Sequence, residues 1–137
     1  MIEIINLQDK HRISKRKFRN LLKKLVEHYR LKEPELSLVF VDTKTIKRLN
    51  RKFLKRDAAT DVLSFPLGEK SPDGKFYLGD IVISVPQAFR QSLSRKHSLE
   101  RELKLLTVHG FLHLAGFDHS AGIEEEEEKV ERLFLSR

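Results

Sequence analysis

The sequence contains no cysteine and no tryptophan, and its only methionine is Met1. The absence of cysteine excludes disulfide bonds and thiolate ligands, so any metal site here must use histidine, carboxylates or water. No apolar run approaches the ~20 residues that a membrane-spanning helix needs. The N-terminal segment MIEIINLQDKHR also lacks the long apolar region of a signal peptide. These absences predict a soluble cytoplasmic protein with no membrane partner.

The length and charge of the chain are informative as well. The 137 residues suit one ordinary domain, and no repeat or linker divides them, so residues 1–137 are predicted to form a single domain. The net charge of +7 is uneven: residues 1–104 carry 24 Lys and Arg against 13 Asp and Glu, whereas residues 105–137 carry 3 against 7. A basic body is typical of proteins that bind polyanions, although net charge also serves solubility alone.

Hydrophobic periodicity predicts an α+β fold, with a small mixed sheet of about four strands packed with about five helices. The predicted strands cover residues 1–7, 35–41, 61–66 and 76–84, with the third ended by a proline and paired with the fourth as a hairpin. Helices are predicted to begin at Ser14, at Asp42 or Thr43, at Pro86 and at Ser98, and the last to cover about 122–135.

The segment HGFLHLAGFDH, residues 109–119, holds three of the six histidines. His109 and His113 are four residues apart on a predicted helix, so they share one face and can converge on one ion. Gly116 can end that helix in a positive-φ conformation, and the resulting turn would bring His119 to the same ion. Three imidazoles leave the fourth position of a tetrahedral zinc open, which favours a catalytic site over a structural one. Asp118 is either a hydrogen-bond partner of a ligand imidazole or a solvated loop acid.

This spacing is that of the metzincin proteases, H-E-x-x-H-x-x-G-x-x-H, with one change. The position of the protease's general base is Gly110 here, and the Met-turn is absent because Met1 is the only methionine. The sequence therefore predicts a metzincin-like metal-binding helix without the peptide-cleaving machinery.

Three segments together resemble the YbeY family of bacterial endoribonucleases. HGFLHLAGFDH resembles the family signature H-G-x-L-H-L-x-G-x-D-H, LNRKFLKRDAATDVLSFP (49–66) resembles L-N-x-x-[YF]-R-x-x-D-x-P-T-D-V-L-S-F-P, and LGDIVIS (78–84) resembles L-G-D-I-x-I-S. The resemblance implies a zinc-dependent, single-strand-specific endoribonuclease with one Zn²⁺ per chain, active in ribosomal RNA maturation and ribosome quality control. It implies single-stranded or ribosomal RNA, the ribosome and assembly factors as partners.

The sequence departs from the family pattern at two positions. The family's arginine after the aromatic residue is Leu54 here, and its proline before threonine is Ala59. We take Arg56 as the substitute that stabilises charge during catalysis, because two residues along an extended chain would aim positions 54 and 56 alike. The candidate RNA-binding cations are Arg51, Lys52, Lys55 and Arg56.

Aromatic side chains near these segments are candidates for stacking on RNA bases, although each is more typical of a core position; they are Phe53, Phe65, Phe76 and Tyr77. Two other functions stay open. One is a metal-dependent hydrolase of a non-RNA substrate such as a peptide or small ester. The other is a ribosome assembly factor in which zinc is mainly structural.

Overall fold

Nine helices and strands follow one another along the part of the chain that the computed structural model describes, which is residues 1–56, 60–70, 72, 74–118, 120 and 122–135. In order they are β1 (Ile2–Asn6), α1 (Lys15–His28), β2 (Glu35–Val41), α2 (Thr43–Leu54), β3 (Val62–Lys70), β4 (Phe76–Ser84), α3 (Val85–Arg95), α4 (Leu99–Leu114) and α5 (Ile123–Phe134). Four strands and five helices in these ranges confirm the predicted α+β class. None of the helices within them is long and apolar enough to cross a membrane.

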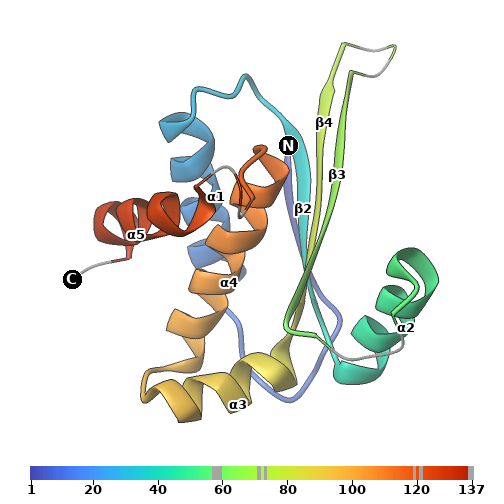
Figure 1. Cartoon of the computed structure of the whole chain (residues 1–137), viewed down its shortest axis with the longest axis vertical. Helices are drawn as coiled ribbons and strands as arrows, with labels where there is room; N and C mark the ends of the chain where they lie inside the picture. The colour runs from blue at the N-terminus through green and yellow to red at the C-terminus, as the bar shows by residue number, and fades with distance from the viewer. Residues whose placement is uncertain (57–59, 71, 73, 119, 121, 136–137) are drawn as a thin grey trace.

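The four strands form one mixed sheet in the order β1-β2-β4-β3. β1, β2 and β4 are parallel to one another, and β3 runs antiparallel to β4 at the edge, which confirms the predicted hairpin. In Figure 1, α1, α4 and α5 lie on one side of the sheet and α2 lies on the other. The edge strand β3 is therefore flanked by α4 on one face and by α2 on the other.

The prediction that Pro66 ends the third strand is wrong. β3 continues to Lys70, and Pro66 pairs opposite Gly79 with a register shift between Pro66 and Glu69. Proline is tolerated in a sheet at an edge strand or a bulge because its missing N–H costs no ladder hydrogen bond there. Gly68 adopts φ +57° within this irregular stretch, so the strand passes the proline through a bulge.

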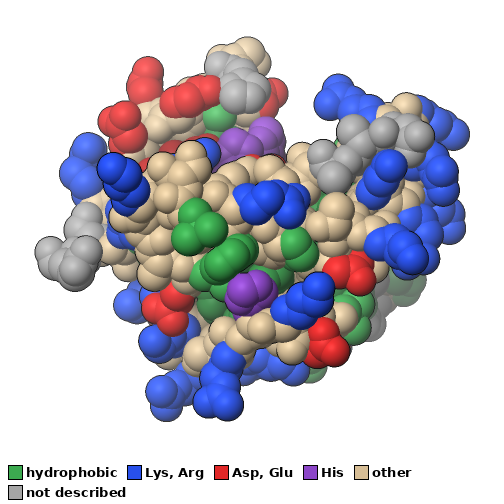
Figure 2. All heavy atoms as spheres, turned by 90° about the horizontal axis from the view of Figure 1, so that it is seen from below, with side chains coloured by type: hydrophobic (Ala, Val, Ile, Leu, Met, Phe, Trp, Pro, Cys, Tyr) green, Lys and Arg blue, Asp and Glu red, His purple; other side chains and the backbone are tan. Residues whose placement is uncertain are grey.

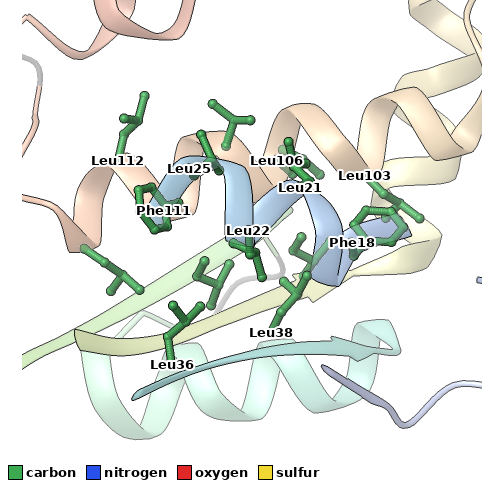
Figure 3. Packing of buried hydrophobic residues seen from close by; sticks show 14 of the residues in the cluster. Phe18, Leu21, Leu22, Leu25, Leu36, Leu38, Leu103, Leu106, Phe111 and Leu112 are labelled. Carbon is green, nitrogen blue, oxygen red and sulfur yellow. The ribbon is translucent and has the colours of Figure 1, made fainter. Parts of the chain in front are cut away.

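The main core lies between the sheet and the pair α1 and α4 (Figure 3). One stripe of α1 supplies Phe18, Leu21, Leu22 and Leu25, all at most 4% exposed. These side chains pack against buried residues of α4 and against the strands; the labelled ones are Leu36, Leu38, Leu103, Leu106, Phe111 and Leu112. Burying each such side chain contributes ~1.5–3 kcal/mol before conformational entropy is subtracted. This shared core holds α4 against α1 and the sheet.

α2 is held on the opposite face by a second, smaller cluster. Val41, Ile46, Leu63 and Val82 are buried there, with Leu49 and Phe65 packed against them. The helix begins at Asp42, whose side chain accepts a hydrogen bond of 2.7 Å from the Thr45 N–H. This decides between the two predicted caps in favour of Asp42.

The N-terminal half of α4 is anchored by a buried carboxylate. Glu102 is fully buried, and its oxygens accept hydrogen bonds from Gln91 at 2.8 Å and Arg95 at 3.0 Å, while His97 lies 2.5 Å away. A buried carboxylate needs such partners because removing it from water is costly. The contacts join α3 to α4 and fix the direction in which α4 points its C-terminal half.

Candidate metal centre and active-site pocket

His109 and His113 lie on one face of the last turns of α4, as the spacing predicts. Their Nε2 atoms are 3.1 Å apart, and their ring centroids are 4.6 Å apart with the planes inclined by 74°. Both side chains are partly buried. The two imidazoles therefore converge through the same nitrogen on one point in space.

This arrangement fits a zinc ion. Two nitrogens that each lie ~2.0–2.1 Å from a tetrahedral zinc are about 3.3 Å apart, close to the separation of the two Nε2 atoms. Neutral imidazole is a donor that zinc favours. Within the described ranges no group of three or more His, Cys, Asp or Glu side chains is placed to hold a metal. His119, the predicted third ligand, lies outside the described residues, so its role stays a prediction.

The chain turns sharply just after these histidines. The Gly116 N–H donates to the His113 carbonyl at 3.1 Å, and the Phe117 N–H donates to the Leu112 carbonyl at 2.9 Å. Together they form a Schellman motif, whose residue after the cap needs positive φ. Gly116 has φ +101°, which confirms the predicted conformation. The turn reverses the chain three residues before His119.

Gly116→Ala is expected to destabilise the fold by ~1 kcal/mol or more, because an L-side chain is strained at positive φ. A Cβ there meets nothing within 4 Å, so the strain comes from the backbone alone. The substitution should also weaken zinc binding by displacing His119. Gly74→Ala is the matched control, since Gly74 has φ +85° and equally open space in the β3–β4 hairpin. Thermal unfolding and zinc titration of both variants test this; equal zinc affinities would contradict the role of the turn.

A carboxylate from α5 contacts His109 through Nδ1, the ring nitrogen that does not face His113. The Oε1 atom of Glu127 is hydrogen-bonded to His109 Nδ1. The hydrogen bond raises the pKa of His109, and burial opposes it in part. With the proton on Nδ1, the lone pair of Nε2 faces His113 and is available to a metal. Carboxylate, imidazole and metal position thus form the arrangement that commonly orients histidine ligands of zinc.

Glu127 reaches His109 because α5 is docked firmly. Ile123 and Val130 are fully buried, and the hydroxyl of Tyr29 in α1 donates to the neighbouring carboxylate of Glu126. Burial and the contact with Glu126 raise the pKa of Tyr29, so the phenol stays a donor. The acidic run EEEEE therefore also contacts α1 through Glu126 and α4 through Glu127.

Glu127→Ala is expected to lower zinc affinity by 10- to 100-fold, the usual effect of removing a partner that orients a ligand imidazole. Glu128→Ala removes the same charge from an exposed neighbouring position and serves as the control. Competitive zinc titration against a chelating dye measures both. If both variants lose zinc affinity by the same factor, the charge of α5 matters and the contact with His109 does not. If neither variant loses affinity, Glu127 has no part in zinc binding.

The two histidines open into a pocket of about 530 Å³ along the edge strand β3. The pocket lies between the C-terminal ends of α2 and α4. Its lining residues are Asn50, Leu54, Arg56, Thr60, Val62, Leu63, Ser64, Pro66, His109 and His113. The structure thus brings the proposed catalytic Arg56 to the same pocket as two of the proposed metal ligands, His109 and His113. Within the part of the chain that the structure describes, no carboxylate lines this pocket.

Arg56 reaches the pocket by a different route from the one the sequence suggests. Leu54 is the last residue of α2, and Lys55 follows in the left-handed conformation with φ +60°. The backbone N–H groups of Lys55 and Arg56 both donate to the Asn50 carbonyl. Positions 54 and 56 therefore line one pocket because the chain turns at a helix end, and the predicted extended path is wrong.

The remaining RNA-binding candidates lie on α2 and its C-cap. Arg51, Lys52 and Lys55 are exposed but do not line the pocket. Figure 2 shows histidine in a hollow, with Lys and Arg gathered on the lobe at the right and Asp and Glu on the edge at the left. The α2 sequence supplies the basic side, and the glutamates of α5 supply the acidic side. A polyanion entering this hollow would be attracted towards α2.

Gly110, which replaces the protease glutamate, is buried against the sheet. A Cβ at this position would lie 2.6 Å from Ile81 Cγ2, and the Gly110 carbonyl accepts a hydrogen bond of 3.3 Å from Ser64 Oγ. Glycine allows α4 to approach β3 and β4 closely. The position faces the sheet, so a glutamate side chain could not be accommodated there without moving α4 away from β4.

Two acidic residues near the histidines are placed differently in the structure. Asp118 is exposed, and its carboxylate accepts hydrogen bonds from the N–H and hydroxyl of Ser120. The carboxylate that contacts His109 is that of Glu127, which the sequence interpretation missed. A glutamate within an acidic run carries no local signal for this contact, because the contact depends on how α5 packs against α4.

Comparisons with known proteins agree with the resemblance. Residues 3–134 match the family described as Endoribonuclease YbeY. A protein of Moorella thermoacetica named Endoribonuclease YbeY is 51% identical over 111 residues, covering 74% of this chain and 71% of that protein. One of the same name from Thermodesulfovibrio yellowstonii is 33% identical, covering 98% and 95%. The solution structure of TM1509 from Thermotoga maritima superimposes with a TM-score of 0.63 and 31% identity, covering 96% of this chain and 87% of that one. The chain belongs to the YbeY family.

Proposed function

We propose that this protein is a zinc-dependent, single-strand-specific endoribonuclease that acts in ribosomal RNA maturation and ribosome quality control. His109, His113 and His119 hold one Zn²⁺ per chain, and Arg56 stabilises charge on the phosphate. The proposed partners are single-stranded or ribosomal RNA, the ribosome and its assembly factors. A ribosomal substrate implies a cytoplasmic enzyme.

One observation carries the proposal: the Nε2 atoms of His109 and His113 converge in a pocket that Arg56 also lines. A hydrolase of phosphodiesters needs positive charge where the phosphoryl oxygens gain negative charge. The family supports RNA as the substrate, since the relatives compared above are named endoribonucleases. The basic α2 beside the pocket agrees with a polyanionic substrate.

The metal, Glu127 and Arg56 each have a definable task in this scheme. When bound, zinc supplies a Lewis acid that polarises a phosphoryl oxygen and lowers the pKa of coordinated water. Glu127 keeps the proton of His109 on Nδ1, so that Nε2 stays a ligand. The guanidinium of Arg56 donates hydrogen bonds to phosphoryl oxygens. Among the described residues that line the pocket there is no carboxylate, and the position of the metzincin general base is Gly110.

The test compares three substrates under identical conditions: a single-stranded RNA, the same RNA annealed into a duplex, and a generic peptide. Cleavage of the single strand alone, lost with a chelator and restored by zinc, is the expected result. Peptide cleavage without RNA cleavage would favour a hydrolase of another substrate. Ribosome association that survives loss of all three histidines, without RNA cleavage, would favour an assembly factor with structural zinc.

RNA binding should be strongly salt-dependent, because α2 meets the strand through phosphates. Each phosphate neutralised contributes a slope of about −0.7 in log K against log salt for a single strand. Arg51→Ala and Lys52→Ala should each make the slope shallower by about that amount. Lys129→Ala removes one positive charge from the acidic helix α5 and should leave the slope unchanged. A flat salt dependence in the unmodified protein would contradict this binding surface.

A further inference from the structure

One aromatic side chain at the pocket is not a core residue. Phe53, on the last turn of α2, is 55% exposed. The other aromatic residues near the pocket segments are placed differently: Phe65 and Phe76 are partly buried and pack against core clusters, and Tyr77 lines a separate pocket with Met1 and Glu3. A single exposed apolar side chain is common on a protein surface, but Phe53 adjoins Leu54, which is also exposed, so the two form an apolar patch at the end of α2.

Phe53 does not line the pocket that holds the histidines, but it adjoins residues that do. It lies between Asn50, one turn earlier on α2, and Leu54, its chain neighbour, and both line that pocket. Its ring contacts Phe65 edge-to-face, with centroids 5.6 Å apart and planes inclined by 70°. Phe65 in turn lies between two further lining residues of β3, Ser64 and Pro66. Because alternate strand residues point to opposite faces, the Phe65 side chain packs on the α2 side of β3, so the aromatic pair lies on that side of the edge strand, next in the chain to pocket-lining residues of both elements.

The ring is both fixed and accessible. The edge-to-face contact with Phe65 restricts its orientation, yet more than half of its surface remains exposed. Lys52 Nζ lies over the ring, 5.3 Å from its centroid. A base that stacks on this face would take the place of the Lys52 ammonium group, which could then meet the phosphate of the same nucleotide. Leu54, 46% exposed, extends the apolar surface towards the pocket where the family has arginine.

We propose that Phe53, supported by Phe65 and Lys52, is a nucleobase-stacking subsite that binds a base of the single strand next to the phosphate held in the pocket. The proposal rests on the proposed function, since it requires RNA in the pocket. Stacking accepts any base because every base has a π-face, so the subsite would select unpaired strands without selecting sequence. A base within a duplex is already stacked and paired, which would explain a preference for single strands.

The experiment measures dissociation constants of the full-length protein for two short phosphorothioate-linked single strands of equal length. One strand carries its bases, and the other is abasic throughout. Phe53→Ala should weaken binding of the base-bearing strand about tenfold, the order expected when one stacked base loses its aromatic partner. It should leave binding of the abasic strand unchanged. Phe53→Trp should keep the affinity for bases. Phe89→Ala is the matched control, because Phe89 is 38% exposed on α3 and stacks on His11 away from the pocket.

Each other outcome has a definite meaning. Equal weakening of both strands in Phe53→Ala would overturn the subsite, because it would indicate a structural role. Unchanged binding of both strands would also overturn it and would assign the exposed ring to a protein partner instead. If the unmodified protein neither binds nor cleaves RNA, the proposed function fails, and the subsite fails with it. If the unmodified protein cleaves RNA while Phe53→Ala binds like it, only the subsite fails.

Discussion

Replacing His113 by alanine is expected to lower zinc affinity by at least ~10²-fold, and RNA cleavage should fall with it. The reason is geometric: the side chain supplies one of the two Nε2 atoms that converge 3.1 Å apart. Its loss should exceed the 10- to 100-fold effect of removing a partner that only orients a ligand. The measurement is zinc content per chain after purification, followed by competitive titration.

His11→Ala is the control for this substitution. His11 lies in the segment before α1, where its ring contacts that of Phe89. The substitution therefore removes an imidazole without changing the pocket. The control should keep the zinc content of the unmodified protein. Full zinc occupancy in His113→Ala would eliminate the proposed metal centre.

Arg56→Ala is expected to reduce single-turnover RNA cleavage by ~10²-fold at saturating enzyme. Removing one preorganised donor from a site of developing negative charge typically costs 10²- to 10³-fold in rate. Saturation removes effects on binding, so the remaining loss reports stabilisation of the transition state. Arg56→Lys should restore only part of the rate, because a lysine cannot donate in the paired geometry of a guanidinium.

Arg51→Ala separates chemistry from general charge. Arg51 lies on α2 near Arg56 in the chain but does not line the pocket. Its loss should weaken binding at low enzyme concentration and leave the saturated rate nearly unchanged. Equal, small effects of both alanine variants would mean that Arg56 is only a surface cation.

Local sequence rules predicted those parts of the site that lie within one helix and its end. The spacing of His109 and His113 on α4 follows from helix periodicity alone, and the positive φ of Gly116 follows from the chemistry of helix caps. Both are found in the structure. The strands 35–41 and 76–84 were likewise predicted to the residue, because their apolar patterns are bounded by capping residues.

The parts that sequence reasoning missed depend on how elements pack together. Glu127 meets His109 only because α5 docks on α1 and α4, and nothing within EEEEE distinguishes it from its neighbours. The left-handed Lys55 brings Arg56 to the pocket, whereas lysine carries no preference for that conformation. Pro66 stays within β3 because β3 is an edge strand. Which strand lies at the edge depends on the order of strands in the sheet, and the local sequence does not indicate that order.

One zinc ion at the converging histidines is expected to make this pocket cleave RNA. The most direct measurement titrates zinc into metal-free protein while bound zinc and cleavage of a single-stranded RNA are followed in the same sample. Activity is expected to rise in proportion to bound zinc and to reach its plateau at one ion per chain. Full cleavage by protein that holds no zinc, or one bound zinc with no cleavage of any single strand, would contradict this expectation.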